Sequence, residues 1–179
     1  MSKKLEILDV ACESLQRKGV NGFSFRDLAD AVGVKSSSVH YHFANKTDLF
    51  TEIVLHFQEI VSKHLESVDE QSTSLKQCLF SFIDIFESSL KEDKFCVCGM
   101  LAVDRQHLAP EVIEVLQGSF QGLEAWLLQV MGKYPATKIS SESLTHLLIA
   151  SCEGALLLDR ASGGQKHLDA LRVTIEALI

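Results

Sequence analysis

A short run near the start of the chain concentrates side chains that can form hydrogen bonds. Residues 36–42 read Ser-Ser-Ser-Val-His-Tyr-His. Hydroxyl and imidazole groups donate and accept hydrogen bonds, and small serine side chains allow a helix backbone to approach phosphates and base edges closely. Serine is a poor helix former, so three in one turn are an unusual choice for a helix that serves only to be stable. The run indicates a surface that contacts nucleic acid. On residue types alone, a helical hairpin with a solvated polar face is the alternative.

Local capping signals indicate how this run is positioned. Ser24 followed by Asp27 forms a capping box, which starts a helix of about two turns. Gly33 ends that helix, because glycine tolerates the positive φ of a tight turn. A second helix should therefore begin within a few residues of the first.

The second helix is polar with one thin apolar seam. Val39 and Phe43 lie four residues apart and so share one face, while polar side chains occupy the rest. Asn45 followed by Asp48 repeats the pattern of a capping residue and an acidic third position, so a further helix should begin near Lys46. The order and spacing of these signals favour two short helices joined by a tight turn and followed by a third.

This stretch resembles the DNA-binding domain of the TetR/AcrR family of bacterial transcriptional repressors. The matching features are the turn Val32-Gly33-Val34, the run 38–43, and Asn45-Lys46 followed by Asp48-Leu49, and the resemblance covers about the first fifty residues. It implies a helix-turn-helix that reads the major groove of a double-stranded DNA operator. It also implies a homodimer and a small-molecule effector.

Within this region we expect a division of labour at the DNA. Tyr41 and Lys46 should contact phosphates, whereas the serines and His40 should approach base edges. The resemblance adds Arg26 on the preceding helix. The full set expected at the DNA is Ser24, Arg26, Lys35, Ser36, Ser37, Ser38, His40, Tyr41, His42 and Lys46.

Composition favours an all-α protein with two parts. Only two of the 179 residues are proline and 46% are hydrophobic. Residues 1–50 carry seven Lys and Arg against six Asp and Glu, whereas the rest of the chain carries ten against eighteen, so only the first part suits a phosphate surface. We expect a helix-turn-helix DNA-binding domain at residues 1–46 and a ligand-binding and dimerisation domain at residues 47–179, joined by a long helix.

Apolar residues at helical spacing predict the remaining elements. Helices are expected at residues 2–18, 46–68, 75–90, 98–107, from 110 onward, at 141–162 and after 164, with links at 69–74 and 134–140.

The helix expected at 141–162 is apolar on more than one side, which a single small core does not require. Small residues such as Ser151 and Gly154 also permit close approach of another helix. The alternative is a fully buried central helix. The resemblance favours a dimer face shared with the last helix, and the expected contacts are Leu144, Leu148, Ser151, Ala155, Leu171 and Ile175.

Aromatic side chains of the second part predict an apolar effector cavity, because they supply large apolar walls. The expected lining is Phe57, Phe82, Phe86, Met100, Phe120, Leu123 and Trp126. His107, Gln121 or Glu153 could orient a ligand, although their simpler role is structural.

Cys96 and Cys98 offer a different way in which the protein could be regulated. Two thiols beside Lys94 at a helix start can react with oxidants or electrophiles when they are exposed as thiolates. Their simpler role is that of small buried hydrophobic side chains.

Other classes of function lack support in the sequence. There is no phosphate loop, no H-E-x-x-H metal motif and no nucleophile elbow, so we expect no enzyme, no cofactor and no metal site. No signal peptide is evident, and no apolar run reaches the roughly 20 residues of a membrane span. We expect a cytoplasmic protein whose five cysteines stay reduced.

These observations predict a ligand-responsive transcriptional regulator, most simply a repressor that leaves its pseudo-palindromic operator when an effector binds. The first alternative is a redox or electrophile sensor that uses Cys96 and Cys98. The second is a helical interaction protein that does not bind DNA.

Overall fold

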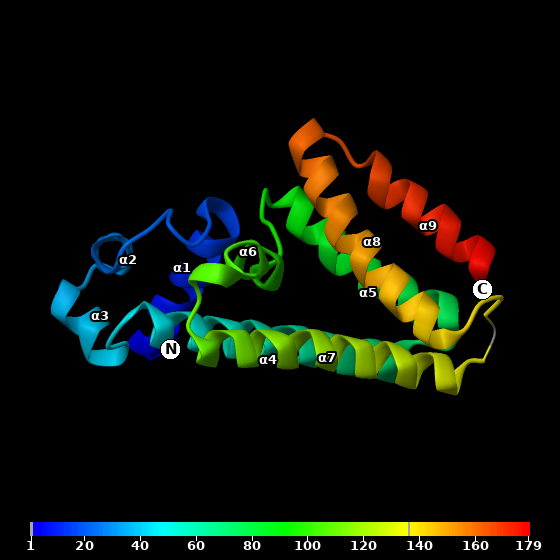
Figure 1. Cartoon of the computed structure of the whole chain (residues 1–179), viewed down its shortest axis with the longest axis horizontal. Coiled ribbons are helices and arrows are strands. Elements are labelled where there is room, and N and C mark those ends of the chain that lie inside the picture. The colour runs from blue at the N-terminus through cyan, green and yellow to red at the C-terminus, as the bar shows by residue number, and fades with distance from the viewer. Residues whose placement is uncertain (1, 136) are drawn as a thin grey trace. The chain divides into compact units, whose positions relative to one another are not determined.

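The computed structural model describes residues 2–135 and 137–179, and the secondary structure of these residues is helical throughout (Figure 1). The elements are α1 Lys3–Lys18, α2 Phe25–Val32, α3 Ser36–His42, α4 Lys46–Gln71, α5 Leu75–Lys91, α6 Val97–Val103, the short 3₁₀ helix η1 Arg105–His107, α7 Pro110–Lys133, α8 Ser141–Ser162 and α9 Lys166–Leu178. The prediction of an all-α fold is confirmed. None of the described helices combines the length and the apolar character that crossing a membrane requires.

The helices group into two compact units. The first contains the residues up to Ile60 together with Cys96–Ser119, and the second contains Val61–Phe95 together with Phe120–Ile179. Helices α4 and α7 each begin in the first unit and end in the second. The predicted domain boundary after residue 46 stays a prediction.

In the first unit, α1 packs against α2, α3 and α6. Helix α1 approaches α6 closely at its end, where Gly19 has a φ of 78° and a Cβ would lie 3.1 Å from the Met100 Cε of α6. Almost completely buried side chains form the core of this unit, among them Ile7, Leu15, Leu28, Val39, Phe43 and Leu101. The helices that carry the predicted DNA surface therefore share one core with α6.

In the second unit, α5, α8 and α9 pack on one another. Arg172 of α9 donates hydrogen bonds to two carboxylates of α5, Asp84 and Glu87, the latter at 2.7 Å. Hydrogen bonds from Lys91 and Arg172 lower the pKa of Glu87 to about 2. The three helices thus pack on one another, and the ion pairs of Arg172 join α9 to α5.

Two predicted boundaries were wrong. Helix α4 continues to Gln71, so the link before α5 is shorter than the predicted 69–74. The Lys133 ammonium donates to the Asp69 carbonyl at 3.2 Å and to its carboxylate at 2.8 Å, and the Tyr134 hydroxyl donates to the Ser72 carbonyl. These distant partners satisfy carbonyl groups at the end of α4, and local spacing gives no sign of them.

The helix predicted at 98–107 is divided in two. Helix α6 ends at Val103, and η1 follows it. The Asp104 N–H donates to the Leu101 carbonyl and the His107 N–H donates to the Asp104 carbonyl at 2.8 Å, which are the tighter i to i+3 contacts of a 3₁₀ turn.

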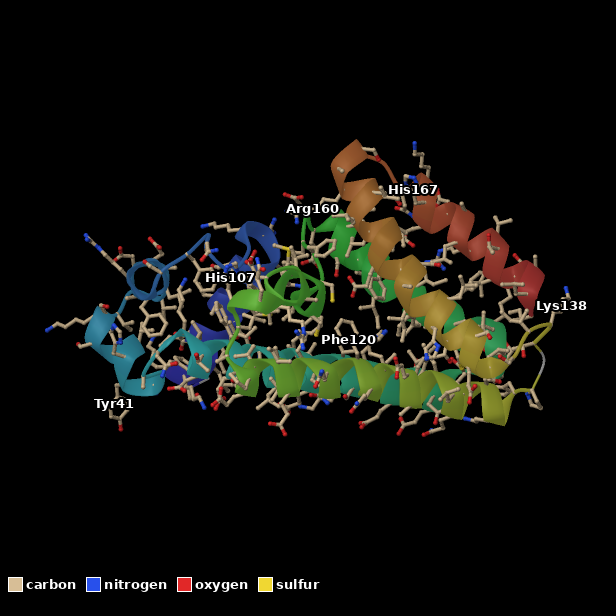
Figure 2. The ribbon with its side chains drawn as sticks, in the orientation of Figure 1. Tyr41, His107, Phe120, Lys138, Arg160 and His167 are labelled. Atoms are coloured by element: carbon tan, nitrogen blue, oxygen red, sulfur yellow. The ribbon has the colours of Figure 1, made fainter. Side chains whose placement is uncertain are left out.

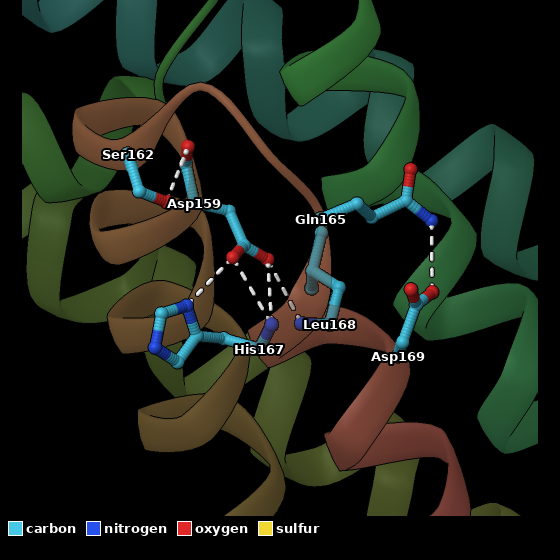
Figure 3. A network of polar contacts seen from close by, with 6 residues as sticks. All are labelled: Asp159, Ser162, Gln165, His167, Leu168 and Asp169. Carbon is cyan, nitrogen blue, oxygen red and sulfur yellow. Dashed lines mark hydrogen bonds and ion pairs between the residues drawn. The ribbon is translucent and has the colours of Figure 1, made fainter.

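Asp159, near the end of α8, is a completely buried carboxylate. It accepts hydrogen bonds from the backbone N–H groups of His167 and Leu168, at 3.0 and 2.9 Å, and lies 2.6 Å from the His167 Nδ1 (Figure 3). Burial alone would raise the pKa of Asp159, but the hydrogen bonds from Leu168 and His167 outweigh it and hold the pKa below its ordinary value. Asp159 therefore caps the start of α9 and fixes the α8–α9 turn.

Replacing Asp159 with Ala should lower the free energy of unfolding by about 2–3 kcal/mol, because buried backbone donors lose a charged acceptor. Urea unfolding measures this loss. Because the folded-state pKa is depressed, the contribution of Asp159 is present above the unfolded pKa and is lost as the pH falls through the folded value. Asp159→Asn should accordingly show a weaker loss of stability below about pH 4 than the unmodified protein.

The control is Asp169→Ala, which removes an exposed carboxylate in the first turn of α9 that accepts a hydrogen bond from the Gln165 side chain. We expect it to cost less than about 1 kcal/mol. Equal losses for the two substitutions would contradict the capping role of Asp159.

Candidate nucleic-acid interface

Helices α2 and α3 are joined as the capping signals predict. The Ser24 Oγ accepts the Asp27 N–H at 3.3 Å, and the Asp27 carboxylate accepts the Ser24 N–H at 2.7 Å, so the capping box is confirmed. Hydrogen bonds from the Ser24 side chain and backbone lower the pKa of Asp27. Gly33 ends α2 with a φ of 71° and a ψ of 39°, the left-handed conformation that favours glycine.

Helix α3 buries one seam and exposes most of its other side chains. Val39 and Phe43 are at most 1% exposed. Ser36 and Ser37 are exposed, and Tyr41 is 85% exposed and extends away from the ribbon (Figure 2). Ser38 and His42 are half-buried. The structure thus presents the small hydroxyl groups and Tyr41 on an open surface of the first unit.

His40 has a structural contact that its position in the sequence does not show. Its ring lies 4.7 Å from the ring of Phe25, centroid to centroid, and this contact joins α3 to the start of α2. His40 is exposed overall, so the ring contact with Phe25 does not bury the residue. Local residue spacing could not predict this ring contact, because Phe25 and His40 lie on different helices.

Three cationic side chains occur near this surface. Arg26 and Lys35 are exposed, and the Arg26 Nε lies 3.9 Å from an Asp30 carboxylate oxygen. The Lys46 ammonium donates to the Val20 carbonyl at 3.2 Å and lies 5.7 Å from the centroid of the Phe23 ring. Asn45 caps α4 by accepting the Asp48 N–H at 3.0 Å, so Lys46 begins this helix as predicted.

The residues predicted for the dimer face lie mainly inside the second unit. Leu144, Leu148 and Ile175 have no exposed surface, and Ala155 and Leu171 are 6% and 7% exposed. Ser151 is half-buried. The exposed apolar side chains of α8 and α9 are different ones, namely Leu147, Leu157, Leu158 and Val173.

The residues predicted for the effector cavity are divided between the two units. Phe57 and Met100 belong to the first unit, and the others belong to the second. There, Phe82 contacts Phe86, with ring centroids 5.6 Å apart, and stacks on Trp126 at 6.1 Å. Phe120 and Leu123 are half-buried. The structure therefore brings Phe82, Phe86 and Trp126 together.

All five cysteines are buried free thiols, and Cys96 and Cys98 are 9% and 3% exposed. Among the described residues, no group of three or more His, Cys, Asp or Glu side chains is arranged to hold a metal ion.

Replacing His40 with Ala should lower the free energy of unfolding by about 1 kcal/mol, because the ring contact with Phe25 is lost. Ser37→Ala on the same helix should change it by less than about 0.5 kcal/mol, since Ser37 is exposed. Thermal and urea unfolding of both variants would measure this difference. The same small effect for both would show that the His40 ring contributes nothing to packing.

Comparison with known proteins places these elements in a family. Residues 7–53 match the family model described as bacterial regulatory proteins, tetR family. The HTH-type transcriptional repressor KstR2 of Mycobacterium tuberculosis is 27% identical over 88 residues, and the chain matches only 44% of that repressor's length. The negative transcriptional regulator IcaR of the icaADBC biofilm operon in Staphylococcus aureus is 25% identical over 91% of this chain and 86% of IcaR.

A solved structure extends the likeness to the whole chain. The crystal structure of a TetR transcriptional regulator from Legionella pneumophila is 32% identical, covers 99% of this chain and 97% of the regulator, and superposes with a TM-score of 0.93. The chain therefore belongs to the TetR/AcrR family of transcriptional regulators, and its α2–α3 pair is the family's helix-turn-helix.

Proposed function

We propose that this protein is a DNA-binding transcriptional repressor whose α3 enters the major groove of an operator. The observation that carries the proposal is the open surface of α3, where Ser36, Ser37 and Tyr41 are exposed on a helix anchored by Val39 and Phe43. This surface lies within the residues that match the family model. Among its relatives, KstR2 is a transcriptional repressor and IcaR is a negative transcriptional regulator.

The side chains divide into phosphate contacts and base contacts. Lys46, Tyr41 and Arg26 carry a cation or a hydroxyl on a long side chain, which suits contact with phosphates. Ser36 and Ser37 are short, so they can make hydrogen bonds to base edges only if the helix itself lies in the groove. The phosphate contacts would fix the register of α3, and the serines would supply part of the specificity.

Lys46→Ala should weaken binding to specific and random duplexes alike and reduce the slope of log affinity against log salt by about 0.9, because one phosphate contact is lost. Ser37→Ala should instead change the preferred bases and leave the salt slope unchanged. Selection of bound duplexes from a random library, followed by fluorescence anisotropy at several salt concentrations, measures both effects.

Equal losses on specific and random DNA for both variants would contradict this division of labour. A complete lack of salt-dependent DNA retention by the unmodified protein would favour the alternative of a helical interaction protein.

We further propose that the repressor is a homodimer that pairs through α8 and α9. Leu147, Leu157 and Leu158 leave an exposed apolar surface on α8, and Val173 on α9 is 70% exposed. A Cβ at Gly154 would meet nothing within 4 Å, so a second helix has room to approach α8 there. Two-fold pairing would hold two copies of α3 about 34–36 Å apart, or somewhat more, to match a pseudo-palindromic operator.

Gly154→Arg should dissociate this dimer, because the isologous contact receives a long charged side chain from each subunit. The fold of each chain should persist, since the site is open and glycine is a weak helix former. Light scattering and sedimentation measure the mass. Gly132→Arg is the matched control, because Gly132 is a helical glycine on α7 where a Cβ would also meet nothing within 4 Å. A monomeric unmodified protein, or a dimeric Gly154→Arg variant, would contradict the proposal.

The effector of this repressor should bind in the second unit, beside Phe82, Phe86 and Trp126. The Trp126 Nε1 is buried and has no hydrogen-bond partner among the described residues. A buried donor without an acceptor costs about 1–3 kcal/mol, which an effector with an acceptor group would recover. A reversible ligand is favoured over thiol chemistry at Cys96 and Cys98, because both side chains are buried away from soluble oxidants.

A further inference from the structure

A cavity of about 360 Å³ lies inside the first unit, and we call it the head cavity. It is formed by the turn after α1, the start of α4, and the segment that runs from the end of α6 into α7. None of the residues that we assign to the effector site of the second unit lines it. Its lining residues are Val20, Asn21, Lys46, Thr47, Phe50, Asp104, His107, Leu108, Ala109 and Val112.

The head cavity has an apolar floor. Val20, Phe50 and Val112 line it and are 8%, 4% and 1% exposed. The Phe50 ring is held in place by an edge contact with Phe23, with ring centroids 6.4 Å apart. The volume is at the small end of the roughly 300–1,000 Å³ of ligand sites. A compact apolar group, such as one ring, matches this floor.

The Lys46 ammonium stands at the wall of the head cavity. It lies 5.9 Å from the centroid of the Phe50 ring and 5.7 Å from that of Phe23, and it donates to the Val20 carbonyl. An ammonium has three N–H donors. Among the described residues, the Val20 carbonyl is the one hydrogen-bond acceptor of the Lys46 ammonium. The positive end of the α4 dipole adds to the same field, since Lys46 is the first residue of α4.

Two other titratable groups line the cavity and lie close to each other. The Asp104 carboxylate lies 3.6 Å from the His107 Nδ1, on the same turn of chain. Asp104 is half-buried and His107 is exposed, and Figure 2 labels His107 on this segment of the chain. Lys46 is the one lysine or arginine among the lining residues, and an incoming anionic group would accept hydrogen bonds from its remaining N–H donors.

We propose that the head cavity binds a small carboxylate with a compact apolar body. The carboxylate accepts hydrogen bonds from the Lys46 ammonium, and the apolar body rests on Phe50 and Val112. Charged hydrogen bonds of this kind are about twice as strong as neutral ones, so the charge decides which ligands enter.

A ligand in the head cavity should also change the affinity of the protein for DNA, and this consequence rests on the proposed function. The Lys46 ammonium is assigned to a phosphate contact, and a bound carboxylate holds the same ammonium against the Phe23 and Phe50 rings. Ligand and phosphate therefore compete for one cation. A carboxylate in the cavity should lower DNA affinity without any change in the second unit.

The test uses benzoate as the probe, with benzamide and benzylammonium as neutral and cationic analogues of similar shape. Calorimetry on the protein without DNA should show saturable binding of benzoate and at least tenfold weaker binding of both analogues. Backbone amide shifts in NMR spectra should change at Asn21, Thr47 and Val112. Lys46→Met, which keeps the length of the side chain and removes its charge, should weaken benzoate binding at least tenfold, whereas Lys35→Met on the same unit should leave it unchanged.

A second variant fills the space and keeps the charge. Ala109→Leu enlarges a side chain that lines the cavity, while the Ala109 carbonyl keeps accepting the Val112 N–H at 3.1 Å. It should abolish benzoate binding and keep DNA affinity, so that benzoate lowers DNA affinity of the unmodified protein only. Unfolding curves confirm that each variant is folded.

Absence of benzoate binding, binding that survives both Lys46→Met and Ala109→Leu, or preference for benzylammonium through Asp104 would each overturn the proposal. Because calorimetry is done without DNA, its result stands even if the protein fails to bind an operator. Conversely, if the protein binds DNA but does not bind benzoate, the proposed function stands and the proposed ligand site in the head cavity is wrong.

Discussion

Helix α3 cannot stand alone, and this constraint shapes the first unit. It has seven residues, three of them serine, and isolated helices shorter than about 12–15 residues are marginal in water. Its apolar anchors are Val39 and Phe43, both almost completely buried. The stability of the proposed reading surface therefore comes from neighbouring helices, through the core shared with α1 and α2 and the contact between His40 and Phe25. Because packing anchors α3, its outer face is free to carry serine and tyrosine in place of strong helix formers.

The caps and turns of the first unit were predictable because they depend on residues three or four apart. Ser24 with Asp27, Gly33, and Asn45 with Asp48 are local signals, and each occurs in the structure where the sequence places it. The hydrogen-bond partners of the lysine ammonium groups were not predictable from the sequence. The Lys46 ammonium meets a carbonyl 26 residues earlier in the chain, and Lys133 meets Asp69 across 64 residues. A long flexible side chain has many rotamers, and only the packed fold selects one of them.

Apolar stripes show the same limit in the second unit. The sequence shows that α8 is apolar on more than one side, but it does not show which side faces the chain's own core. The structure places Leu144 and Leu148 inside and leaves Leu147, Leu157 and Leu158 exposed. Helical spacing alone cannot separate these sets, since both satisfy the same period. We still propose that α8 and α9 form the dimer contact, but through different residues. Which leucines are exposed could be learned only from the three-dimensional structure.

Regulation of such a repressor requires an effector to distinguish two states of the protein, because a ligand with equal affinity for both shifts nothing. The chain offers two places where this discrimination could occur at different cost. The proposed effector beside Trp126 would act in the second unit, and its effect would have to reach α3 through elements such as α4 and α7, which each begin in the first unit and end in the second. A carboxylate in the head cavity needs no such transmission, because it engages Lys46, the residue assigned to the phosphate. A ligand that competes for the Lys46 ammonium can lower the DNA affinity by no more than one phosphate contact contributes. Displacement of α3 can instead remove every contact that this helix makes with DNA. If both proposed sites exist, the site in the second unit suits a strong switch and the head cavity suits a modest adjustment of DNA affinity.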